Sequence, residues 1–194
     1  MVAAVQYPWR PPHTIIGKLR AIYDIRQAAY RTIAGGMLAV DEIALQERLD
    51  TRRIVLAGAS LGSVFATIHG AIDGRLQQVV LIHGGADLQD MLEAEIPHVP
   101  AWIRRPVVRA ARVTIDTFDP AHYVARIAPR NLLVIAARDD WRFPPRAVVA
   151  FFNRARQPKE LLWTNTQHVG ARSPRVVETV MAELNAYLRS HPSD

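Results

Sequence analysis

Five short runs of apolar residues recur along the chain, most of them built from Val, Ile and Leu with few polar residues between. Such runs are typical of strands buried on both faces of a parallel sheet, because polar alternation is expected only where one face meets water. We therefore predict a set of buried parallel strands. They lie at residues 2–7, 53–58, 78–84, 131–137 and 160–165.

Between these runs, apolar residues recur every three or four positions, which is the spacing of a helix with one buried face. The stretch 18–49 contains two helical segments, or one kinked helix, broken near Gly35 and Gly36. Ser173 and Pro174 suit the N-cap and first turn of a last helix. Alternating strands and helices predict an α/β fold, a mostly parallel sheet with helices on both faces.

Residues 88–118 interrupt this alternation between the third and fourth predicted strands. The stretch contains prolines, a tryptophan and several arginines, and it has no strand-like run. We expect it to form a small cap insertion over a cleft at the carboxyl ends of the strands. A chain of 194 residues is long enough for one sizeable core, so we predict a single domain over 1–194.

Charge and composition narrow the expected partners. The net charge is +6, but the arginines are scattered and do not alternate with aromatic residues, so we expect no nucleic-acid partner. No apolar run approaches the roughly 20 residues that span a bilayer, so we expect no membrane partner. The first residues lack the features of a signal peptide. The absence of cysteine excludes disulfides and a cysteine nucleophile, and it favours a reducing, cytoplasmic location.

The sequence Gly58-x-Ser60-x-Gly62 lies where a predicted strand becomes a predicted helix. This is the context of a nucleophile elbow, a tight turn that exposes a strained serine and requires small flanking residues. The amide of Leu61, at the start of the helix, would then be one oxyanion donor. The alternative is an ordinary strand–helix turn with a serine N-cap.

A serine nucleophile needs a histidine base and an acid that orients it, and in this context they follow in the order Ser, acid, His. Asp139 and Asp140 come just after the strand at 131–137, and His168 comes just after the strand at 160–165. Each could be an ordinary surface or loop residue. Their order and their shared position beyond strand ends predict a catalytic triad with Ser60.

With these motifs, the chain resembles the α/β-hydrolase superfamily over nearly its whole length. The stretch AARDDWRFPP is similar to the acid loop of that family, and its spacing selects Asp140, with Phe143 and Pro144 after it; HVG resembles the histidine loop. Residues 118–140 resemble serine esterases related to acetyl-esterases, dienelactone hydrolases and prolyl-oligopeptidase-type domains. The resemblance implies a cofactor-free serine hydrolase that cleaves a small or medium carboxylic ester through an acyl-enzyme. A peptidase or thioesterase would use the same triad.

The N-terminus departs from the family pattern. Only the predicted strand at 2–7 precedes the elbow strand, whereas the family has at least two there and takes its second oxyanion donor from the earlier loop. We therefore expect an α/β-hydrolase fold that is N-terminally short, with an exposed sheet edge that favours a homodimer. Alternatively, 2–7 is the earlier strand and the turn at 7–10 supplies the donor. An incomplete oxyanion hole would suit a non-catalytic binding protein.

Several other residues have weaker functional interpretations. Trp102 and Trp141 are candidates for the substrate pocket. The sequence IHGG, from residue 82 to 85, resembles a lipase oxyanion motif but follows the serine, so we interpret it as a strand-end turn. We expect His69 to be a packed helix residue and Asp119 to start a helix before Pro120. The remaining histidines lack metal-ligand spacing, so we predict no metal site.

Overall fold

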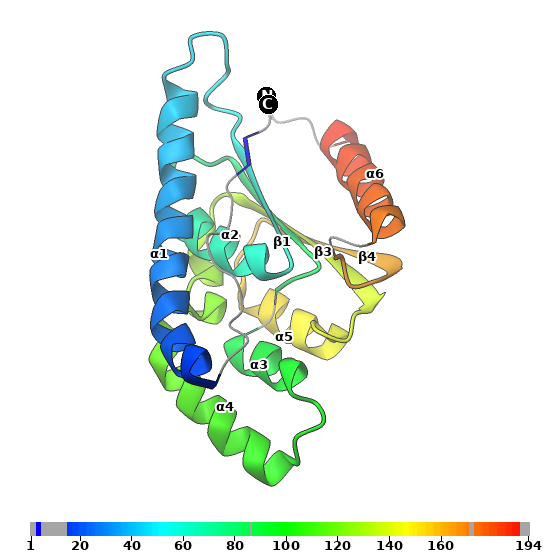
Figure 1. Ribbon diagram of the computed structural model, residues 1–194. Coiled ribbons are helices and arrows are strands. Elements are labelled where there is room, and N and C mark those ends of the chain that lie inside the picture. The colour runs from blue at the N-terminus through cyan, green and yellow to red at the C-terminus, as the bar shows by residue number, and fades with distance from the viewer. Residues whose placement is uncertain (1–2, 5–14, 86, 171–172, 191–194) are drawn as a thin grey trace.

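The computed structural model describes residues 3–4, 15–85, 87–170 and 173–190. Within this part of the chain, four strands form one parallel sheet in the order β1-β2-β3-β4 (Figure 1). The strands are β1 (Val55–Ala59), β2 (Gln78–Ile82), β3 (Asn131–Asp139) and β4 (Lys159–Gln167). They confirm four of the five predicted strands. The fifth, at 2–7, lies outside the described residues except for Ala3 and Ala4, which belong to no strand.

Helices alternate with the strands, as predicted. They are α1 (Ile15–Ala44), α2 (Leu61–Ile72), α3 (Leu88–Glu95), α4 (Ala101–Ile115), α5 (Pro145–Arg154) and α6 (Pro174–Ser190), with 3-10 turns at Asp116–Phe118, Pro120–His122 and Val124–Arg126. The last helix begins at Pro174, directly after Ser173, as the sequence predicts. Within the described residues, no helix combines the length and the apolar character needed to cross a membrane.

Helices cover both faces of the sheet. On one face, α2 and α5 pack against β2 and β3 through a cluster that includes Ala66, Val134 and Phe151. On the other face, α6 packs against β2 and β3 through Val180 and Leu184. Helix α1 lies outside α2, and Figure 1 shows it as a long rod along one side of the molecule. The predicted fold class is therefore confirmed.

The expected break in the first helix is wrong, because α1 continues without interruption through Gly35 and Gly36. The second glycine has a packing role instead. A Cβ atom at Gly36 would lie 2.8 Å from Nδ1 of His69, a buried residue on α2. A glycine therefore lets α1 and α2 approach closely, and the tertiary contact offsets its low helix propensity.

Strand β1 is the least covered strand of the sheet. It pairs only with β2 among the described residues, and Val55, Ala57 and Ala59 on one of its faces are exposed. The cluster around α6 includes residues of β2, β3 and β4 but none of β1. Among the described residues β1 is therefore an edge strand, and an exposed sheet edge that favours a homodimer stays a prediction.

The predicted insertion at 88–118 consists of α3, α4 and a 3-10 turn. These two helices pack on each other, and α4 also contacts α1. Figure 1 shows them at the lower end of the molecule, the end toward which the strands run. The insertion is therefore a helical pair outside the two layers that cover the sheet.

Candidate active site

Ser60 occupies the turn between β1 and α2 in a strained backbone conformation. Its φ is 53° and its ψ is −123°, a region that non-glycine residues rarely adopt. The Ser60 amide donates to the carbonyl of Ile82 on the neighbouring strand at 2.9 Å. A Cβ atom at Gly58 would lie 2.3 Å from the carbonyl oxygen of Gly62, so this position has to be glycine. The local geometry is that of the predicted elbow.

Gly62 differs from Gly58. A Cβ atom placed on Gly62 would meet no heavy atom of the structure within 4 Å. The expectation that both flanking positions must be small therefore holds for Gly58, whereas nothing in the described part of the chain requires it at Gly62.

The structure brings Ser60, His168 and Asp140 together in a line of hydrogen bonds. The Ser60 Oγ lies 2.8 Å from Nε2 of His168, and Nδ1 of the same ring lies 2.7 Å from Oδ2 of Asp140. With the imidazole proton on Nδ1, the ring donates to the carboxylate, and Nε2 can accept the proton of the serine hydroxyl. This is the arrangement that activates a serine as a nucleophile.

Of the two adjacent acids, only Asp140 contacts the histidine. Its side chain is buried, and its Oδ1 accepts from the amides of Arg142 at 2.9 Å and Phe143 at 3.0 Å. These two amide bonds fix the carboxylate orientation and leave Oδ2 for His168. Asp139 instead ends β3, beside an irregularity in the pairing with β4, and its side chain is exposed.

Phe143 supports the histidine ring from one side. Its ring is buried and stacks on the imidazole of His168, with centroids 5.6 Å apart and planes inclined by 19°. The sequence placed Phe143 in the acid loop only through the family resemblance. The contact gives it a physical role, because the stack limits rotation of the base.

His83 is a residue at the site for which the sequence predicted only a turn. It is completely buried, its φ is 45°, and its Nδ1 accepts a hydrogen bond from the amide of Val169 at 2.8 Å. Its Nε2 lies 3.3 Å from the hydroxyl of Thr164. Burial lowers the pKa of this imidazole, although the negative charge of Asp140 opposes the shift. A neutral His83 therefore anchors the backbone of the residue that follows the candidate base.

Gly84 joins the same turn to the serine. A Cβ atom there would lie 1.9 Å from Oγ of Ser63 and 3.4 Å from the carbonyl oxygen of Ser60. The IHGG sequence therefore connects the two halves of the site, since His83 contacts the histidine loop and Gly84 packs against the elbow. The motif was visible in the sequence. The partners of His83, Thr164 and Val169, lie more than 80 residues further along the chain, so only the folded structure shows these contacts.

The other predicted site residues are placed as follows. Leu61 is the first residue of α2, where helix amides have no partner within the helix, so its amide remains a candidate oxyanion donor. Trp141 follows Asp140 directly and is exposed, with the guanidinium of Arg142 over its ring. Trp102 lies on α4 and is also exposed. A pocket role for either tryptophan stays a prediction.

Two predictions about other polar residues can also be compared with the structure. His69 is buried on α2, as expected, and Asp119 caps the turn at Pro120–His122 by accepting from the amide of Ala121. The ligand atoms of Asp116, Asp119 and His122 lie within 4.8 Å of one another. The Arg112 guanidinium, however, lies 3.5 Å from the first carboxylate and 3.4 Å from the second. The Arg112 guanidinium is therefore the cation that faces these two carboxylates in the structure.

No family model and no curated protein matches the chain. Its structure is similar to that of an acetyl xylan esterase from Paenibacillus sp. R4, with 22% identity and a TM-score of 0.62, over 95% of this chain and 60% of that one. An esterase from Pyrococcus furiosus, PF2001, matches with 18% identity and a TM-score of 0.62, over 82% and 62% of the two chains. The alpha/beta hydrolase GrgF from Penicillium sp. sh18 matches with 15% identity and a TM-score of 0.61, over 83% and 72%.

The chain spans less than two thirds of the length of the two esterases. At these identities the likeness concerns the arrangement of helices and strands. That arrangement agrees with the resemblance of the elbow, acid loop and histidine loop. The chain has the α/β-hydrolase fold.

Proposed function

We propose that this protein is a serine hydrolase that cleaves a small or medium carboxylic ester through an acyl-enzyme. The observation that carries the proposal is the unbroken hydrogen-bond line from Ser60 through His168 to Asp140. The solved structures that share the fold include proteins described as esterases, which agrees with an ester as the substrate class. The same geometry would serve a thioesterase or a peptidase, so the substrate test has to include their substrates.

In the proposed first step, the Ser60 oxygen attacks the ester carbonyl carbon while its proton passes to Nε2 of His168. Asp140 stabilises the imidazolium that forms and keeps the ring in the useful orientation. The carbonyl oxygen becomes an oxyanion that accepts from the amide of Leu61. When the tetrahedral intermediate collapses, the ester C–O bond breaks and the alcohol leaves with the proton from His168.

In the second step, water attacks the acyl-enzyme carbonyl and gives its proton to His168. Collapse releases the carboxylic acid and returns the proton to Ser60. Leu61 supplies one oxyanion donor, and no second donor is identified among the described residues. Since loss of one such donor lowers turnover by about 100- to 1000-fold, the rates of both steps depend strongly on the number of oxyanion donors.

The test is covalent labelling followed by turnover. We expect a fluorophosphonate to add once to the wild-type protein, as read by intact mass, and not to Ser60→Ala. In a separate experiment, the unlabelled wild-type protein should hydrolyse p-nitrophenyl acetate with an initial burst. Thioester and peptide probes then establish which acyl class is preferred. A folded wild-type protein that takes no label would contradict the proposal. That result would favour a ligand-binding protein in which Ser60 is not nucleophilic.

A further inference from the structure

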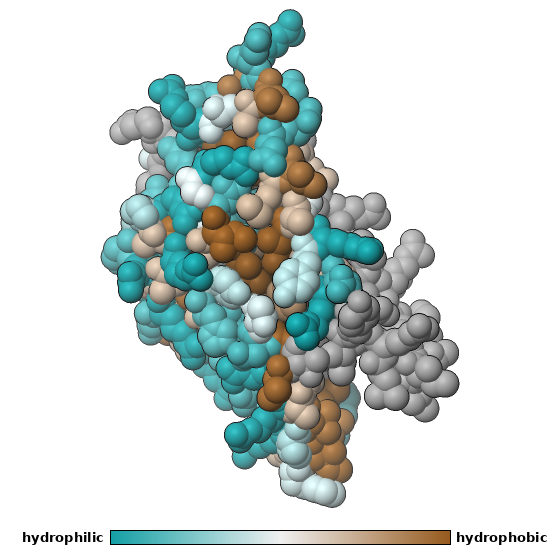
Figure 2. Space-filling model, turned by 90° about the vertical axis from the view of Figure 1, so that its left-hand side faces the viewer, coloured by the Kyte–Doolittle hydropathy of each residue, from teal (hydrophilic) through white to brown (hydrophobic). Residues whose placement is uncertain are grey.

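Helix α4 of the insertion exposes its apolar side. Val108 is buried against the rest of the molecule, whereas the opposite side of the helix carries Trp102, Val107 and Val113, which are 78%, 53% and 76% exposed. At 100° per residue these three side chains, with Ile103, fall within one stripe. Figure 2 shows apolar side chains at the lower end of the molecule, where Figure 1 places α4. An amphipathic helix in a globular domain normally turns this side inward.

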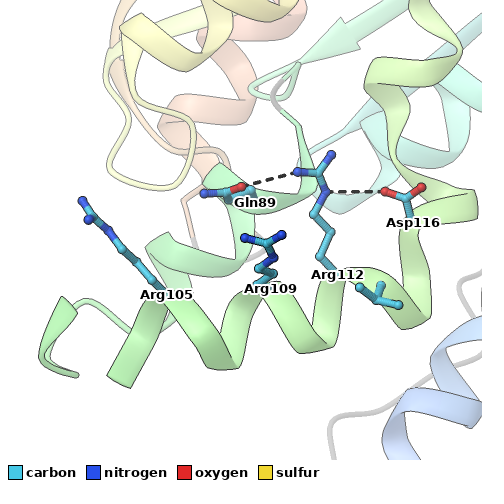
Figure 3. A pocket seen from close by; sticks show the side chains of 6 residues that line it. Gln89, Arg105, Arg109, Arg112 and Asp116 are labelled. Carbon is cyan, nitrogen blue, oxygen red and sulfur yellow. Dashed lines mark hydrogen bonds and ion pairs between the residues drawn. The ribbon is translucent and has the colours of Figure 1, made fainter. Parts of the chain in front are cut away.

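A row of arginines borders the apolar stripe. Arg105, Arg109 and Arg112 lie on one side of α4 and line a cavity of about 650 Å³. Figure 3 shows Arg109 and Arg112 near Gln89 of α3, whereas Arg105 points away from Gln89. Arg112 is paired with acidic groups, but Arg105 and Arg109 form no ion pair within the described part of the chain. The helix itself contains no acidic residue.

From these observations we propose that α4 docks the protein on an anionic lipid surface. A helix with an apolar face that ends in tryptophan and with arginines along its edge lies in the plane of a bilayer interface. The apolar side chains enter the acyl boundary, and Arg105 and Arg109 extend their stems to reach lipid phosphates. At about 1.5 Å per residue, the 15-residue helix offers a contact roughly 22 Å long.

The charge pattern favours this occupant over a second copy of the chain. Two α4 helices packed through their apolar stripes would bring arginine rows of the same sign together, which opposes association. An anionic surface instead attracts Arg105 and Arg109, which form no ion pair within the described part of the chain. Surface docking revises the expectation of no membrane partner, which rested on the absence of a spanning segment and did not consider binding at the interface.

The test is co-sedimentation of the full chain with phosphatidylglycerol-containing vesicles and with pure phosphatidylcholine vesicles, at low and high salt. We expect binding to the anionic vesicles that weakens with salt. Val107→Asp with Val113→Asp should reduce the partition coefficient by about 100-fold, because two apolar side chains no longer enter the lipid. Arg105→Gln with Arg109→Gln should reduce it by about 30-fold, at roughly fivefold per arginine near an anionic surface.

Helix α6 offers matched controls on the opposite side of the molecule (Figure 1). Val177 and Met181 are exposed apolar residues there, so Val177→Asp with Met181→Asp should leave binding within about twofold, as should Arg175→Gln with Arg189→Gln. Wild-type protein that stays in the supernatant with anionic vesicles would overturn the proposal. Equal losses in the α4 and α6 pairs would also overturn it.

Two further measurements distinguish lipid docking from self-association of the chain. The Trp102 emission should shift to the blue on vesicle binding, and the shift should disappear in Trp102→Phe. Size-exclusion chromatography gives the oligomeric state; a dimer that the α4 valine variants dissociate, without vesicle binding, would assign the surface to a second copy and refute the lipid proposal. Ser60→Ala should bind vesicles like the wild type, so this test is independent of the proposed hydrolase activity.

Discussion

The carboxyl end of the sheet buries polar side chains, whereas the helical insertion beside it exposes apolar ones. Around the triad, polar side chains are enclosed and paired: Asp140 and His83 are both buried, and each accepts from backbone amides. On α4, apolar side chains such as Val113 are exposed, and Arg109 projects over a cavity. Enclosed polar groups are costly unless their geometry is fixed, so the first region is built for orientation. The second combines exposed apolar side chains with arginines, the pattern on which the proposed lipid docking rests.

The largest effect that this comparison predicts is at the acid. Asp140→Asn should lower kcat on an activated ester by about 10⁴-fold, because the amide no longer holds the imidazole in the useful tautomer. Asp139→Asn should change kcat by less than about threefold, since that side chain is exposed and does not contact His168. Steady-state kinetics on both variants distinguishes them, and equal losses would mean that the two acids share the role.

The next effect concerns His83, which reaches the base only through the backbone of Val169. His83→Leu removes the acceptor and should lower kcat by about 10- to 100-fold with little change in KM. His83→Asn should recover most of that loss, because an asparagine oxygen can accept from the same amide and asparagine tolerates a positive φ. If both variants lose the same activity with the same loss of stability, His83 has only a packing role.

A stability effect follows from the glycines. Gly84→Ala should lower the free energy of unfolding by about 1–3 kcal/mol, because its Cβ atom would overlap Oγ of Ser63. Gly62→Ala should raise it by up to about 1 kcal/mol, since alanine favours the helix and meets no atom within 4 Å. Urea denaturation measures both. A destabilised Gly62→Ala would contradict the prediction that this position tolerates a side chain.

The smallest effect is on the pH dependence of stability. Burial lowers the pKa of His69 in spite of its hydrogen bond to Asp73, and burial also lowers the pKa of His83. The unfolded state therefore binds protons more readily at these two residues than the folded state does. The free energy of unfolding should be unaffected by them above about pH 6.5 and should fall as the pH drops below that value. Urea denaturation at several pH values above and below about 6.5 measures this effect. The free energy of unfolding should change less with pH for His69→Gln than for the wild type.

The contrast between the two regions also accounts for which features could be predicted from sequence. The central strands β2 and β3 could be predicted because burial on both faces leaves uninterrupted apolar runs. The elbow could be predicted because steric demands at Gly58 restrict the residue type. Asp140 was selected over Asp139 only through the resemblance to the acid loop of the α/β-hydrolase superfamily. The break expected in α1 was wrong, because the reason for Gly36 is a neighbour on another helix.

His83 could not be recognised in advance for a similar reason. Its motif was visible, but its partners Thr164 and Val169 come from a strand two positions away in the sheet and from the loop that follows it. Sequence separation hides such contacts, since local pattern reports only on helix and strand periodicity. The role of the histidine emerged from which side chains the parallel strands bring to one edge.

The sequence by itself determined the α/β class, the order of elements and the residue types at the strand ends, because hydrophobic periodicity and steric limits act over a few residues. Only the tertiary structure decided which backbone amide His83 anchors and which side of α4 faces outward. Periodicity shows that a helix has an apolar side, but the same pattern fits a side turned to the core or to a partner. That choice depends on what the rest of the chain places beside the helix.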